Sequence, residues 1–367
     1  MRRTVAGLVV VLAFGSDAGA QDTHLDMFLY EKSYAALGTP SVIGSPDYYS
    51  DIAEPPLLAE AQFAVHLAMR RGFLPSELRE GRKGTGLNIY ITPQFRLRAR
   101  DVHSGPVASI SFMPKFTFQW LRSTGGGSNP RTGSRRIFAA KAVIGHHSNG
   151  GATCEFLDED PMDPIEACRF PNASFPDDLP AEDRQYWVEG GNFSTNYVEL
   201  GVSARFGTLD EIKTDESHWR WALDVGLTLQ RNHSVGFPLP GGAQPDFARI
   251  YGVNRARLEL AGHVNEFLIN GVALRGWMKL DAFNARRQFA GGRDYTLASE
   301  LMVHGLREKH RRSDPPVLLR WLPSFLGVGL RYSRGQDYYN TQFVRDISFL
   351  QLIFAVDPWS PSAEEGR

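Results

Sequence analysis

The sequence predicts an all-β fold, a transmembrane antiparallel β-barrel of about 12 strands. Three observations predict it. Apolar and polar residues alternate with a period of two along most of the chain. The alternating segments run for roughly 10 to 15 residues, the length that a tilted strand needs to cross a bilayer. The chain also lacks an apolar run of the roughly 18 residues that a spanning helix requires.

Residues 86–98 illustrate the alternation, because their two faces differ in polarity throughout. The odd positions are Leu87, Ile89, Ile91, Pro93, Phe95 and Leu97. The even positions are Asn88, Tyr90, Thr92, Gln94, Arg96 and Arg98. An apolar face opposite a charged one suits a barrel wall between lipid and a polar lumen. A β-sandwich also alternates, but its strands average about five or six residues.

Eleven segments share this pattern. They are residues 60–71, 86–98, 106–121, 135–148, 191–206, 217–231, 248–262, 270–284, 294–306, 322–333 and 346–357. Single-chain bacterial barrels have an even number of strands, and residues 27–37, with aromatic residues at even spacing, are the candidate for the missing first strand. The strand that ends near residue 148 then runs outward, and residues 149–190 form a long extracellular loop.

The two ends of the chain are expected to lie outside the barrel. Two arginines precede a short apolar stretch at residues 5–14, and residues 18–20 form a small-x-small cleavage site, so residues 1–20 are interpreted as a signal peptide. Residues 21–59 form an N-terminal segment that includes the first strand. Residues 60–358 form the barrel, and residues 359–367 form a polar tail.

The composition excludes some partners and suggests one crosslink. The formal net charge is −1, so no nucleic-acid partner is expected. The only cysteines, Cys154 and Cys168, lie in the predicted extracellular loop. In an exported protein a pair this close favours a local disulfide over a metal or redox site.

The same parity rule applies to the strand that ends in His146-His147-Ser148. Lys141 marks its odd positions as lumenal, so His146 and Ser148 face lipid and His147 faces the lumen. Polar groups that face lipid are costly unless they satisfy one another. His146 and Ser148 are two residues apart on one face, about 6.5–7 Å at the backbone, which lets an imidazole activate a serine hydroxyl.

The next strand supplies a group that could orient this histidine. Its even positions are apolar and outward-facing except for Asn196 near its start. A neutral amide can hold the histidine tautomer with a smaller desolvation penalty than a carboxylate facing lipid would incur. Parity therefore places His146, Ser148 and Asn196 on one lipid-facing surface.

At this point the sequence resembles a known family. HHSNG at residues 146–150 and NFSTN at residues 192–196 resemble the outer-membrane phospholipase A family. So do FAVHL at residues 63–67, the spacing of Pro106 and Pro114, and YSRGQDYYN at residues 332–340. The resemblance implies a twelve-stranded barrel with Ser148 as nucleophile, His146 as general base and Asn196 as the residue that orients it.

The resemblance also implies a calcium ion and a homodimer. The implied calcium ligands are the carbonyl of Gly151, the side chain of Asn192, and the segment before Pro106, with Ser104 and Gly105. Two positions depart from the family's pattern: Gly105 stands where a serine is expected, and Asn192 replaces a hydroxyl residue, although an amide oxygen suits calcium. The long segment at residues 149–190 is a further departure.

The expected function is hydrolysis of acyl ester bonds of phospholipids in the outer leaflet of the outer membrane. Two alternatives stay open. A lipid A deacylase is a related barrel esterase with a similar His-x-Ser strand. A non-enzymatic pore or structural barrel belongs to another class, although a lumen enclosed by about 12 strands is narrow and easily filled by side chains.

Overall fold

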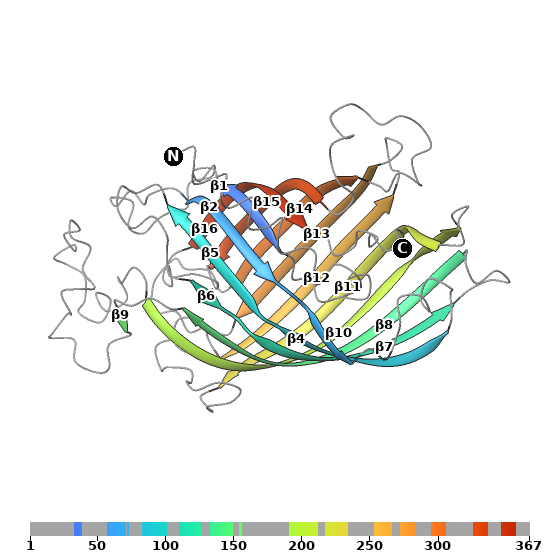
Figure 1. The fold of residues 1–367 in the computed structure, drawn as a ribbon, viewed down its shortest axis with the longest axis horizontal. Helices are drawn as coiled ribbons and strands as arrows, with labels where there is room; N and C mark the ends of the chain where they lie inside the picture. The colour runs from blue at the N-terminus through green and yellow to red at the C-terminus, as the bar shows by residue number, and fades with distance from the viewer. Residues whose placement is uncertain are drawn as a thin grey trace, which may run out of the picture.

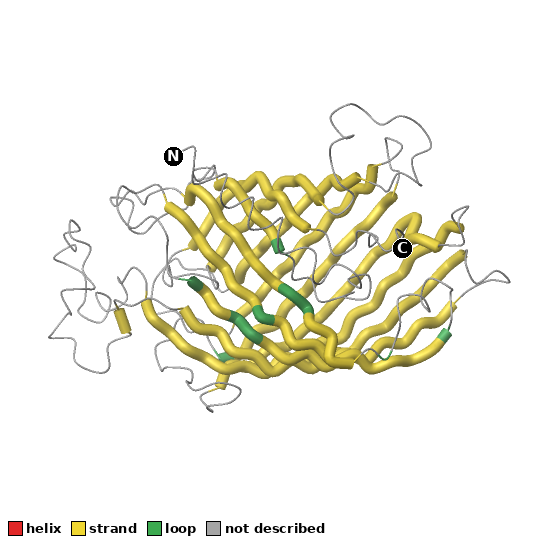
Figure 2. The backbone as a smooth tube through the Cα atoms, viewed as in Figure 1, coloured by secondary structure: helices red, strands yellow, loops and turns green. Residues whose placement is uncertain are grey.

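The computed structural model describes the strands and little of the connecting chain. The described residues are 33–38, 57–70, 72, 83–100, 110–125, 133–149, 154–155, 191–211, 217–233, 253–265, 272–283, 295–305, 326–336 and 346–356. All regular secondary structure in these ranges is β-strand (Figures 1 and 2). No helix in the described ranges is long and apolar enough to cross a membrane.

The strands follow one another as the sequence alternation predicts. They are β1 (Tyr34–Gly38), β2 (Leu57–Ala64), β3 (Leu67–Arg70), β4 (Gly84–Thr92), β5 (Gln94–Arg100), β6 (Ser111–Phe112), β7 (Lys115–Gly125), β8 (Gly133–Asn149), β9 (Cys154–Glu155), β10 (Gly191–Glu211), β11 (Ser217–His233), β12 (Asn254–Asn265), β13 (Val272–Phe283), β14 (Tyr295–Gly305), β15 (Leu326–Gln336) and β16 (Asp346–Val356).

Antiparallel pairing closes these strands into a barrel. Each strand from β10 to β16 pairs with the next, and β16 pairs with β1. The ring continues from β1 through β2, β5 and β6 to β8, which pairs with β10. The short strand β9 pairs with β10 in parallel and lies outside this ring.

Three of the barrel strands are interrupted near their middles. Thr92 pairs with Lys115 and Phe95 pairs with Phe112, so Pro93 and Pro114 lie opposite each other between β4/β5 and β6/β7. Neither proline has an N–H to donate, so the ladder breaks there without a change in register. The pairs β2/β3, β4/β5 and β6/β7 are therefore single strands, and the barrel has 12.

The burial pattern is inverted relative to a soluble domain. Large apolar side chains are exposed on the outer surface, among them Leu200 at 60%, Leu229 at 59% and Leu301 at 53%. Lysine, arginine, aspartate and glutamate side chains are buried on the inner surface. An apolar outside and a polar inside are the properties of a strand wall that faces lipid. The predicted transmembrane antiparallel barrel is thus confirmed.

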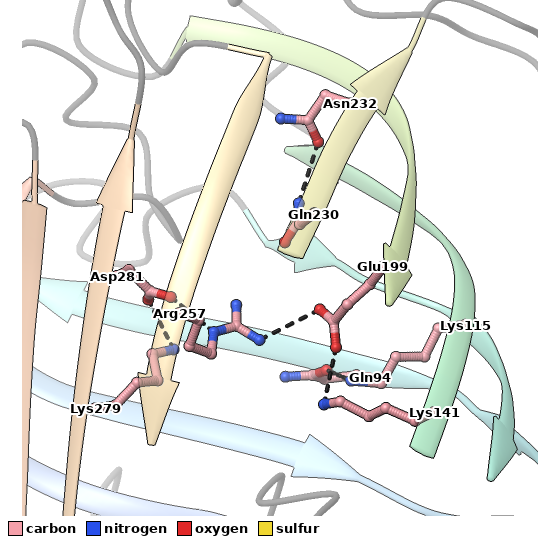
Figure 3. A network of polar contacts seen from close by, with 9 residues as sticks. All are labelled: Gln94, Lys115, Lys141, Glu199, Gln230, Asn232, Arg257, Lys279 and Asp281. Atoms are coloured by element: carbon pink, nitrogen blue, oxygen red, sulfur yellow. Dashed lines mark hydrogen bonds and ion pairs between the residues drawn. The ribbon is translucent and has the colours of Figure 1, made fainter. Parts of the chain in front are cut away.

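The lumen is crossed by paired charges. Glu199 on β10 accepts from Lys141 on β8 at 2.8 Å and from Arg257 on β12 at 3.3 Å (Figure 3). Arg257 also pairs with Asp281 on β13 at 2.7 Å. A second group joins Arg331 on β15 to glutamates on β14 and β2. Two of these pairs, Glu199 with Arg257 and Arg331 with Glu60, link strands that are not neighbours, so they tie separate parts of the wall together inside the lumen.

Each segment predicted from alternation overlaps a barrel strand, and residues 106–109, 248–252 and 322–325 of these segments lie outside the described part. The first strand is shorter than residues 27–37 in the described part, because β1 begins at Tyr34 and residues 27–32 lie outside that part. The signal peptide, the polar tail and all of the 149–190 loop except Asn149 and β9 also lie outside the described residues. Cys154 contributes backbone to β9 and Cys168 is not described, so the disulfide stays a prediction.

Candidate active site

The candidate site occupies the end of β8 and the start of β10, on the outer face of the wall. In β8 the even positions are outward, as the 40% exposure of Phe138 shows, and the odd positions, including Lys141, are buried in the lumen. In β10 the exposed Val198 and Leu200 mark the even positions as outward. Strand parity therefore assigns His146, Ser148 and Asn196 to the lipid-facing side.

His146 and Asn196 are directly opposite residues of the β8–β10 pair and form a hydrogen bond. The His146 Nδ1 lies 2.8 Å from the Asn196 Oδ1. An amide oxygen can only accept, so Nδ1 carries the proton and donates it. In a neutral imidazole this leaves the lone pair on Nε2. The asparagine thus selects the tautomer in which Nε2 can act as a base.

Ser148 follows His146 by two residues on the same face and is half-buried. It lies opposite Ser194 on β10 and Phe112 on β6. This spacing of about 6.5–7 Å between backbones lets the histidine ring lean toward the hydroxyl. The structure thus brings all three predicted residues to one patch, with the His146–Asn196 contact formed.

Aromatic side chains pack over the outward-facing His146 and contribute to its burial. His146 is 4% exposed and Asn196 0% exposed, although their parity is that of exposed leucines. The ring of Phe112 packs edge-on against His146 with 6.5 Å between centroids, and Phe95 packs on Phe112 at 5.0 Å. Exclusion of water by these rings strengthens the hydrogen bond beneath them.

The interrupted strand places Phe112 where it covers the histidine. Pro114 cannot donate to β8, but its carbonyl accepts from the His146 backbone N–H at 3.0 Å. Beyond this break β6 still pairs with β8, so Phe112 stays opposite Ser148.

His147 occupies the opposite face of the wall. Its side chain is 1% exposed and shares the parity of the buried, lumenal Lys141. The two adjacent histidines therefore lie on opposite faces of the wall.

A glycine supports the site from the lumenal side. Tyr197, next to Asn196, lies opposite Gly145, next to His146. A Cβ atom added at Gly145 would overlap the phenol ring of Tyr197. Only glycine leaves this ring room to lie against β8 behind the histidine.

The calcium ligands implied by the family resemblance fall mostly outside the described chain. Ser104, Gly105 and Gly151 are not described, and only the backbone of Asn192 is, in β10 beside Glu155 of β9. As residue types, a carbonyl and an amide oxygen are the donors that calcium prefers. Among the described residues no group of three His, Cys, Asp or Glu side chains could hold a metal.

Two polar residues beside the site were missed in the sequence. The predicted segment 217–231 ends too early, because β11 continues to His233. His233 lies opposite Asn196, and Arg231 lies opposite Val198. Continued alternation beyond the exposed Leu227 and Leu229 would have placed both of them on the outer face.

Comparison with known proteins gives the following. No protein-family model and no curated protein matches the chain. Among solved structures, it is similar to outer membrane phospholipase A from Escherichia coli, with a TM-score of 0.43, 11% identity, 93% of this chain and 99% of that chain covered. It is also similar to a Salmonella typhi outer membrane phospholipase dimer with bound calcium, with a TM-score of 0.41 and 11% identity. That match covers 90% of this chain and 91% of the other.

The porin OmpF of Salmonella typhi, in complex with daunomycin, gives a TM-score of 0.32 at 8% identity, with 88% of this chain and 95% of that chain covered. Both enzymes and a porin are thus among the similar structures. Matches at these values do not separate one activity from the other. The barrel assignment rests on the strand pairing and the inverted burial described above.

Proposed function

We propose that this protein is an outer-membrane serine esterase that hydrolyses the acyl ester bonds of phospholipids. The observation that carries the proposal is the buried 2.8 Å hydrogen bond between His146 and Asn196 on the outer face. A structural histidine–asparagine pair has no need to lie on the lipid side of a barrel, where polar groups are costly. Because the pair lies beside Ser148, its histidine can activate the serine hydroxyl as a nucleophile.

The proposed reaction has two halves. The Nε2 atom of His146 accepts the proton of the Ser148 hydroxyl as Oγ attacks the ester carbonyl carbon. The same proton then passes to the departing alcohol oxygen, and the acyl group remains on Ser148. A water molecule, deprotonated by Nε2, attacks the acyl-enzyme, and the fatty acid leaves as Ser148 regains its proton. Asn196 keeps the proton on Nδ1 throughout.

Calcium is part of the proposal through the family resemblance. Gly151, Asn192 and the residues Ser104 and Gly105 would hold it, and a bound cation would add positive charge close to a developing oxyanion. Chelation with EGTA should then lower the rate at least tenfold, and added calcium should restore it. An unchanged rate would remove calcium from the proposal. A homodimer, implied by the same resemblance, is testable by crosslinking in vesicles.

Glu199 and Arg257 pair past the intervening strand β11. Such side-chain contacts occupy part of the narrow lumen of a 12-stranded barrel, which favours the esterase over a passive pore. The lipid A deacylase alternative uses the same side chains. Phospholipid and lipid A assays on one preparation separate the two substrates.

The deciding test compares wild type with Ser148→Ala for fatty-acid release from phospholipid vesicles. Loss of at least roughly 10³-fold is expected when a nucleophile is removed. Ser194→Ala is the matched control, because it removes the hydroxyl directly opposite on the same face. Equal release by wild type and Ser148→Ala would overturn the proposed nucleophile. Retained membrane fractionation and heat-modifiable gel mobility would show that the variants fold.

A further inference from the structure

Two basic side chains lie on the outer face one strand away from Asn196. Arg231 and His233 on β11 share the parity of Leu227 and Leu229, which are 48% and 59% exposed. His233 lies opposite Asn196, and Arg231 lies opposite Val198. Both therefore adjoin the candidate site on the lipid-facing surface.

Their surroundings supply little compensation for their polarity. Arg231 is exposed and lies between Val198, 40% exposed, and the adjacent outward Leu229. None of the ion pairs resolved between described residues involves Arg231. Within the same part of the chain, the buried Nδ1 of His233 has no hydrogen-bond partner.

In the lumen, one buried arginine is paired with carboxylates of the wall. There Arg257 has two carboxylates, at 2.7 Å and 3.3 Å. A guanidinium on the lipid face without such a partner is destabilising unless it reaches the interface or meets an external anion. The outer-face pair thus calls for an anion that the described chain does not supply.

The position of the pair fits the phosphate of a bound lipid. β11 is two strand spacings from β8, and in the register His233 and Arg231 are two and four residues along from the level of Ser148. The backbone separations are therefore roughly 12 Å and 16 Å, and the extended arginine side chain shortens the longer one. In a glycerophospholipid the acyl esters and the phosphate are attached to the same three-carbon glycerol. An ester carbonyl at Ser148 therefore places the phosphate on the side of the patch that β10 and β11 provide.

We infer that Arg231 and His233 form a phosphate-binding subsite for the lipid substrate. The planar guanidinium donates two parallel hydrogen bonds to phosphate oxygens, and the imidazole adds an N–H donor. This inference rests on the proposed function in that Ser148 holds the ester. It goes further in naming the side chains that select phosphate-bearing lipids over neutral esters.

The kinetic test uses two substrates that differ in the phosphate. Wild type and Arg231→Gln/His233→Gln are assayed in mixed micelles of dioleoyl phosphatidylglycerol or dioleoylglycerol. The ratio of kcat/KM for the phospholipid to that for the diacylglycerol should fall by roughly 10- to 100-fold, the effect of losing a charge-assisted hydrogen bond. Arg136→Gln, which removes an exposed outward arginine at the other end of β8, should leave the ratio unchanged. An unchanged ratio in the double variant would overturn the subsite.

A binding test separates this inference from the proposed function. Ser148→Ala and Ser148→Ala/Arg231→Gln are purified, and co-purifying lipid is measured by native mass spectrometry after exposure to phosphatidylglycerol or to a phosphorylated glucosamine lipid. Weaker retention of either lipid by the double variant supports the subsite and identifies the source of the phosphate. Equal retention of both lipids contradicts it, even if no ester is hydrolysed. Absence of hydrolysis with all substrates would refute the esterase alone.

Discussion

The lumen and the outer face of this barrel both bury polar side chains, but they satisfy them differently. In the lumen, Lys141, Glu199, Arg257 and Asp281 form a chain of ion pairs at 2.7–3.3 Å. On the outer face, the contact resolved among the described residues is the hydrogen bond of His146 with Asn196. These four lumenal charges thus satisfy one another, whereas the outer-face contact uses only the Nδ1 atom of His146.

This difference separates stability from activity. Removing one partner of a buried ion pair leaves an uncompensated charge, so lumenal substitutions should lower the free energy of unfolding. Substitutions on the outer face should lower catalysis, because in the proposed reaction the groups there act on substrate. The following predictions run from the largest expected effect on hydrolysis to the smallest.

The adjacent histidines give the largest contrast. His146→Ala should lower kcat/KM for phospholipid by roughly 10³-fold or more, because the general base is lost. His147→Ala should keep activity within a few-fold, because that side chain is buried on the lumenal face of the wall. Fatty-acid release from vesicles measures both. If His147→Ala is the inactive variant, the outward assignment of His146 is wrong.

Much of this contrast could be predicted from the sequence. Residues of a strand alternate between its two faces, so a single charged residue that marks the lumen, here Lys141, assigns each of the others to the lumenal or the outer face. That rule sufficed for the barrel and for the shared face of His146, Ser148 and Asn196. The pairing of His146 with Asn196 also followed, because a long antiparallel hairpin brings its two ends together.

Other features depend on contacts between distant segments and could not be predicted. The cover by Phe112 requires the register of β6 against β8, which is set around Pro114. The lumenal pairing of Glu199 with Arg257 skips over β11, and alternation gives no information on such contacts. His233 was missed because the polar residues at the end of β11 obscured the end of the strand.

Asn196→Ala should have the next largest effect. Without its oxygen the His146 ring loses its fixed tautomer, and kcat should fall roughly 10- to 100-fold, part of what general base catalysis contributes. KM should change little, because Asn196 is 0% exposed and does not reach the substrate. Asn196→Asp keeps an acceptor and should retain more activity than the alanine variant. A pure KM effect in steady-state assays would argue against an orienting role.

Gly145→Ala should affect both faces. The added methyl displaces the Tyr197 ring, and overpacking of this kind costs about 1–3 kcal/mol of stability. Because the ring lies behind the His146 strand, activity should also fall, by roughly twofold to tenfold. Gly262→Ala is the matched control, since a Cβ there has nothing within 4 Å. Equal thermal and kinetic behaviour of the two variants would show that Tyr197 does not support the site.

Glu199→Gln should have the smallest effect on hydrolysis and a large one on stability. Its carboxylate pairs with two cations, so a neutral amide leaves the charges of Lys141 and Arg257 only partly compensated. The free energy of unfolding should fall by about 3 kcal/mol. Urea unfolding in vesicles, followed by tryptophan fluorescence, measures this loss. Ser203→Ala, a buried lumenal change on the same strand, is the control. At urea concentrations below the unfolding transition, the rate of hydrolysis should stay within twofold of wild type, because Glu199 and the candidate site lie on opposite faces of the wall. A large kinetic loss there would mean that the lumenal charges act on the outer-face site, and that the two sides of the wall are coupled.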